Sequence, residues 1–128
     1  MLLLAYGAAS LLHYAHNAEF LADYPNLPVW MSRTKVYVAW LGVTAVGLIG
    51  YLLVRRGYQL FGLSVSAVYA ALGFDGLGHY SLASLSAHTT TMNLTIWLES
   101  ATAALLLTAV FVLAAKQALS RRRKLESE

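Results

Sequence analysis

One uninterrupted apolar stretch, VYVAWLGVTAVGLIGYLLV, fills residues 36–54 and contains no charged side chain. A helix needs roughly 20 predominantly apolar residues to cross the hydrocarbon core of a bilayer, and this stretch has that length. Three further stretches are also long enough and nearly as apolar, at about residues 2–21, 58–82 and 92–115. The sequence therefore predicts four membrane-spanning helices.

The composition agrees with a membrane protein made of one domain. Hydrophobic residues make up 59% of the 128, charged residues only 12%, and the mean hydropathy is +0.59. This charged fraction is about half of the roughly 25% typical of soluble domains. Cysteine is absent, which excludes disulfides and thiolate ligands. The net charge of +3 is too small and too localised to indicate nucleic acid, and no nucleotide-binding or serine-hydrolase motif occurs.

The connections between the four stretches are short, so neighbouring helices should be antiparallel. We therefore predict an all-α integral membrane protein, an antiparallel four-transmembrane-helix bundle forming a single domain over residues 1–120. Residues 121–128 should form a basic cytoplasmic tail, whose closing LESE partly resembles vector-derived sequence and receives no role. The first stretch lacks the basic start of a signal peptide, which favours a retained helix.

Basic residues are unequally divided between the two predicted sides of the membrane, and cytoplasmic loops carry an excess of Lys and Arg. Arg33 and Lys35 lie on one side. The other side carries Arg55, Arg56, Lys116, Arg121, Arg122, Arg123 and Lys124. We expect a multi-pass protein of a bacterial inner membrane, with both termini in the cytoplasm.

Ionisable residues interrupt three of the predicted helices near one depth. Counted from the expected helix ends at 1.5 Å per residue, His16, Asp75 and Glu99 should lie roughly 10–12 Å below the outer interface. His13 should lie about one turn deeper than this layer, and His79 about one turn shallower. The cytoplasmic half of the helices, in contrast, is apolar. Helical phase also gives each of these helices one polar face. The faces comprise His13, His16, Asn17 and Phe20; Asp75 and His79; and Met92, Thr95, Glu99 and Thr102.

An acid at bilayer depth costs about 2.5–3.5 kcal/mol, so the two acids need partners. A divalent cation bound by imidazole and carboxylate groups would neutralise both. The sequence predicts a zinc or iron site, and five candidate ligands exceed the three protein ligands typical of catalytic zinc, which leaves room for a dinuclear centre bridged by Glu99 or Asp75. The predicted ligands are His13, His16, Asp75, His79 and Glu99.

Each feature also has a structural interpretation. The histidines could hydrogen-bond across helices, Asp75 could pair with a histidine, and Glu99 could be protonated by burial. Aromatic residues near the predicted helix ends are typical of an interfacial belt. They are Tyr24, Trp30, Tyr37, Trp40 and Tyr80.

Three functions fit this pattern, and whether the chain is an enzyme stays open. The first is a membrane metalloprotein, a metal-dependent hydrolase or oxidoreductase acting on a lipid-like or other small molecule, with Glu99 as general base. The second is a subunit of a proton or metal-ion transporter, which would need a homo-oligomeric pore. The third is a haem b protein with His79 and a first-helix histidine as axial ligands. The role of His88 is left open.

Overall fold

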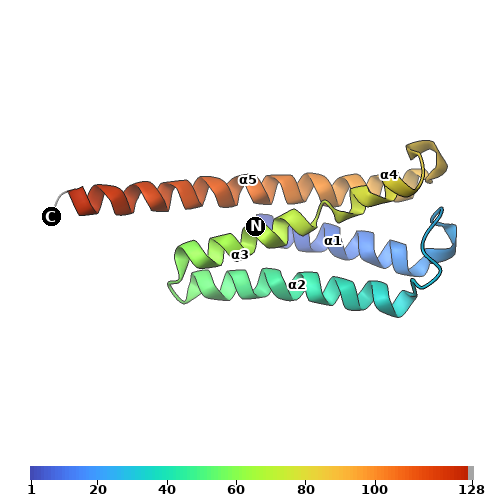
Figure 1. Ribbon diagram of the computed structural model, residues 1–128, viewed down its shortest axis with the longest axis horizontal. Helices are drawn as coiled ribbons and strands as arrows, with labels where there is room; N and C mark the ends of the chain where they lie inside the picture. Colours follow the sequence, from blue (N-terminus) through green and yellow to red (C-terminus); the bar gives the residue numbers. More distant parts are fainter. Residues whose placement is uncertain (127–128) are drawn as a thin grey trace.

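The computed structural model describes residues 1–126, and its regular elements are all helices (Figure 1). Glu128 of the closing tail lies outside the described residues. The α-helices are α1 (Leu2–Glu19), α2 (Arg33–Arg55), α3 (Gln59–Leu72), α4 (His79–Leu82) and α5 (Thr90–Glu126). The four long ones run alongside one another in alternating directions. α1 packs against α2 and α5, and α3 packs against the same two helices.

Within the described residues, three segments are long and apolar enough to cross a membrane. They are Arg33–Arg55, Gln59–Leu82 and Thr90–Arg123. The all-helical, membrane-type prediction is confirmed at this level. The first predicted span folds as α1 but is not one of the three, because its last two turns carry His13, His16, Asn17 and Glu19.

The third predicted helix is not continuous. The α-helix ends at Leu72, and a 3₁₀ turn, η2 (Asp75–Gly78), leads into the single turn of α4. The segment GFDGLG contains three glycines, and glycine is a poor helix former. Asp75 and His79 therefore belong to different short elements, and their expected stacking on one face of a regular helix was wrong.

Helix α5 is much longer than the predicted stretch at residues 92–115. Its 37 residues span about 55 Å at 1.5 Å per residue. Its C-terminal part continues past the other helices in Figure 1 and carries the cluster of Arg and Lys residues. The basic tail is therefore an extension of the last helix, at least as far as Glu126.

The apolar core lies between α1, α3 and α5. Tyr6 is fully buried there, its ring centroid 4.6 Å from that of Tyr69, and its hydroxyl donates to the Tyr69 carbonyl at 3.2 Å. The remaining core residues are Leu63, Ala70, Ala103, Leu106 and Val110. Beside this core, α2 approaches α3 closely: a Cβ built on Gly62 would lie 2.9 Å from the Gly50 carbonyl oxygen. Small residues that allow such approach are typical of membrane helix interfaces.

Residues 20–32 and 83–89 meet at one end of the molecule, which we call the loop end (Figure 1). Asn26, at a positive φ of 58°, donates its side-chain amide to the Leu82 carbonyl at 2.8 Å. Ser32 caps α2 by accepting a hydrogen bond from the backbone N–H of Lys35. The connection between α1 and α2 is thus tied to α4, next to the polar residues of the bundle.

Candidate functional site

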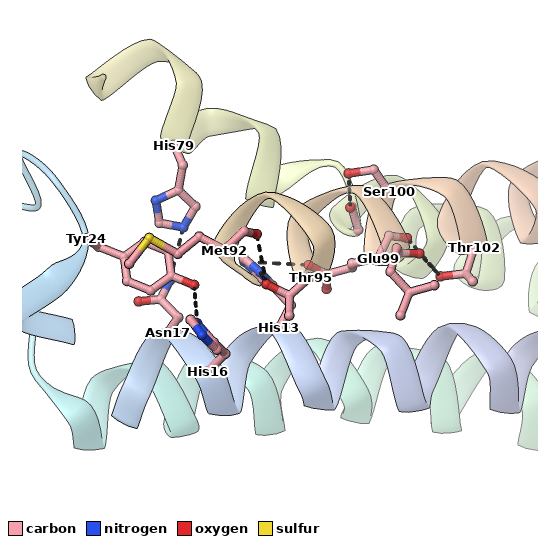
Figure 2. Close-up of polar contacts among 12 residues, drawn as sticks. His13, His16, Asn17, Tyr24, His79, Met92, Thr95, Glu99, Ser100 and Thr102 are labelled. Carbon is pink, nitrogen blue, oxygen red and sulfur yellow. Dashed lines mark hydrogen bonds and ion pairs between the residues drawn. The ribbon is translucent and has the colours of Figure 1, made fainter. Parts of the chain in front are cut away.

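Among the acids of residues 1–126, the most deeply buried is Glu99, on α5. Its side chain is 1% exposed, and neither carboxylate oxygen has a hydrogen-bond partner. The nearest basic atom is Nε2 of His13, on α1, at 3.8 Å from Oε2. That distance is beyond a hydrogen bond. The predicted polar stripe on α5 does face inward, since Met92 and Thr95 are buried with Glu99 (Figure 2).

The hydrogen bond of His13 to Thr95 indicates which of the two ring nitrogens carries the proton. Thr95 donates its only hydroxyl proton to the Met92 carbonyl at 3.0 Å. The Thr95 oxygen can therefore only accept from Nδ1 of His13, which lies 3.4 Å away. With the proton on Nδ1, a neutral His13 presents the lone pair of Nε2 to the carboxylate. Two electron-rich atoms thus face each other across 3.8 Å in a buried space, and either a proton or a cation between them would offset their repulsion.

Gly76, in η2, covers this gap. A Cβ built on it would lie 3.2 Å from His13 Nε2 and 3.3 Å from Glu99 Oε2. Any side chain at this position would crowd the two facing atoms. Gly76 therefore keeps the gap free of protein atoms.

His79, on α4, lies beside this pair without entering it. Its ring is in edge contact with that of His13, with centroids 5.6 Å apart. Its Nε2 is 3.1 Å from the side-chain nitrogen of Asn17, and its Nδ1 has no partner (Figure 2). Asp75 is exposed, but it lines a cavity of about 350 Å³ together with His13, Asn17 and His79. Leu27, Pro28 and Met31 of the first loop form another wall of this cavity.

His16, a predicted ligand, is directed elsewhere. Its ring packs on Phe20, and its Nδ1 lies 3.0 Å from the hydroxyl of Tyr24. Burial raises the pKa of Tyr24 to about 12, so its hydroxyl stays protonated beside this nitrogen. The structure thus brings His13 to Glu99 and separates His16 from both, although the sequence placed His16 at the depth of Glu99.

Tyr24 was expected in the interfacial aromatic belt, but it is 3% exposed. Its ring centroid lies 4.9 Å from that of His79 and 5.9 Å from that of His16. The 3₁₀ turn η1 (Leu21–Asp23) directs the chain back toward the bundle, so that Tyr24 closes the polar cluster at the loop end.

Sequence reasoning missed the supporting roles of Thr95, Asn17, Tyr24 and Gly76. Thr95 and Asn17 do lie on the predicted polar faces, so helical phase was a usable signal for them. Tyr24 and Gly76 lie in irregular backbone, for which helical phase gives no direction.

Comparison with protein-family models, with curated proteins and with solved structures finds no match to this chain. Across residues 1–126, no three His, Asp or Glu side chains are gathered closely enough to hold one metal ion as they stand.

Proposed function

We propose that the chain is a small integral membrane metalloprotein, an antiparallel four-helix bundle that binds zinc or iron between His13 and Glu99. One observation carries this proposal: the Nε2 lone pair of His13 faces an unpartnered, buried carboxylate at 3.8 Å. A metal cation between the two atoms would satisfy both and offset the cost of burying the acid.

The spacing suits two ligands of one ion. Ligand atoms at about 2.1 Å from a tetrahedral metal are about 3.4 Å apart, close to the observed separation. The Nδ1–H bond of His13 to Thr95 fixes the tautomer that such a ligand needs, as hydrogen bonds behind metal-binding histidines generally do. Asp75 and water from the adjoining cavity would complete the coordination after a shift of the Asp75 side chain.

An open coordination position toward the cavity would suit hydrolysis or oxidation of a small or lipid-like molecule. A bound metal lowers the pKa of coordinated water and so supplies a nucleophile at neutral pH. Glu99 is more suitable as a ligand than as the general base, because it faces His13.

The metal proposal is tested on protein purified in lipid nanodiscs, by metal analysis per chain after supplying zinc and ferrous iron. We expect at least one tightly held ion, which His13→Gln and Glu99→Gln both lose. His16→Gln is the matched control, a histidine one turn away on the same helix that lies outside the cavity. Full metal content in His13→Gln would refute the site.

A metal-free wild-type protein would leave a proton as the charge shared by His13 and Glu99, as in the proton-transporter alternative. The haem alternative is disfavoured by the edge contact between His13 and His79, because a porphyrin would have to separate the two rings. Absence of a Soret band in the purified protein would exclude it.

We propose further that the loop end lies outside the cytoplasm, as the basic residues indicate. The chain has no cysteine, so single cysteines report topology directly. Ser86→Cys and Arg56→Cys are both at exposed positions, at the loop end and in the turn between α2 and α3. An impermeant thiol reagent added outside intact cells should label Ser86→Cys alone. The opposite pattern would invert the orientation.

A further inference from the structure

His88 lies just before α5 at the loop end, and the site described above does not use it. Its side chain is only 6% exposed. Its Nδ1 lies 2.9 Å from the Ser84 carbonyl oxygen. A carbonyl can only accept, so Nδ1 carries the proton and Nε2 carries a lone pair. That Nε2 is buried without a partner.

The ring of His79, in edge contact with that of His88, has an unpartnered nitrogen of its own. The two ring centroids are 6.1 Å apart, and Nδ1 of His79 has no partner. The other nitrogen of His79 contacts the side-chain amide of Asn17. An amide can turn its oxygen to this ring, accept from Nε2–H and thereby leave a lone pair on Nδ1.

We propose that His79 Nδ1 and His88 Nε2 bind a second transition-metal ion, on the loop side of the ion at His13 and Glu99. The inference rests on the proposed function and makes the metal centre dinuclear. Two imidazoles on one ion at about 2.0–2.1 Å have ring centroids roughly 5–6 Å apart, close to the 6.1 Å of this pair.

Metal-binding histidines typically form a hydrogen bond through the ring nitrogen that does not bind the metal, and both of these rings have a partner for such a bond. The Ser84 carbonyl orients His88 by accepting from its Nδ1–H, and the Asn17 amide, with its oxygen turned to the ring, would orient His79 in the same way through Nε2–H. The predominance of imidazole nitrogens favours zinc, copper or iron over magnesium and calcium. Tyr80, whose ring centroid is 5.4 Å from that of His88, holds this ring against the bundle.

A buried water is the competing occupant, donating to His88 Nε2 and accepting from His79 Nδ1–H. Water and metal are distinguished by the number of ions that the protein binds. The experiment titrates chelator-treated protein in nanodiscs with Co²⁺, followed by visible absorption and by equilibrium dialysis. We expect two equivalents for wild type and for His16→Gln, and one for His88→Gln. His79→Gln should lose the same ion, whereas His13→Gln should retain it.

Two equivalents retained in His88→Gln would overturn the second position. A single equivalent in wild type, lost only in His13→Gln, would overturn it while the proposed function stands. No binding in wild type would overturn both. The number of Co²⁺ ions bound per wild-type chain tests the proposal even if a histidine variant fails to fold. One ion per chain is incompatible with the proposal.

Discussion

Two buried regions of this protein are built largely from the same helices and differ in how their polar atoms are satisfied. In the core around Tyr6 and Tyr69, the Tyr6 hydroxyl reaches a carbonyl, and nearby the Ser66 hydroxyl donates to Gly62 at 2.9 Å. At the loop end, buried polar atoms remain unpartnered. They belong to Asn17, His79, His88 and Glu99. Two more unpartnered atoms lie elsewhere, on Ser10, one turn before His13, and on Trp40 of α2.

If the proposed metal site is correct, this difference distinguishes polar groups that hold the fold together from polar groups that bind a ligand. Most buried polar groups in proteins are hydrogen-bonded, so a cluster of unpaired ones needs an explanation. A site that binds a cation must keep lone pairs free, whereas a packing core must not. If the two regions are independent, damage to one should leave the other intact.

The largest effect is expected in the core. Tyr6→Ala removes a fully buried aromatic ring and should lower the free energy of unfolding by about 3–5 kcal/mol. At a temperature where the variant is still folded, its metal affinity should be unchanged. Thermal unfolding and metal titration on the same sample measure the two effects. Loss of metal binding in a folded Tyr6→Ala variant would show that the two regions are not separable.

Removal of the metal should lower the stability of the protein, because the proposed ligands join helices near the loop end. A ligand at a hundredfold excess over its dissociation constant stabilises the folded state by about 2.7 kcal/mol. Chelation followed by dialysis should therefore lower the melting temperature, and zinc or ferrous iron should restore it. An unchanged melting curve in verified metal-free protein would favour a purely structural polar network.

Thr95→Val should weaken metal binding with little effect on folding. The change keeps the shape of the side chain but removes the oxygen that accepts from Nδ1 of His13. Loss of such a supporting hydrogen bond typically costs 10–100-fold in metal affinity. Ser66→Ala in the helix packing is the control and should leave affinity unchanged. Equal affinity in wild type and Thr95→Val would contradict the assigned His13 tautomer.

The smallest effect is expected at Gly76. Alanine would place a methyl group 3.2–3.3 Å from the two facing atoms, and overpacking of this kind costs about 1–2 kcal/mol. Metal affinity should fall accordingly. Gly78→Ala is the matched control in the same turn, because a Cβ there meets nothing within 4 Å. Equal affinities of the two variants would place the ion elsewhere.

The sequence by itself determined the helical, membrane-type architecture, because apolar segments of spanning length have few other stable forms in a bilayer. Burial of the Met92, Thr95 and Glu99 stripe also followed from helical phase alone. The phase of α1 could not decide between His13 and His16. They lie on one arc of the helix, and the choice depends on how α1 is rotated against α5.

Only the tertiary structure decided the rest of the site. The break after Leu72 separates Asp75 from His79, and it depends on packing around the glycines as well as on their helix propensity. Burial of Tyr24 and His88 depends on two loops that fold back onto the helices through long-range contacts, such as that between Asn26 and Leu82. Local pattern predicts which face of a helix is polar. Which polar atoms meet is set by the relative rotation of the helices and by the course of the loops.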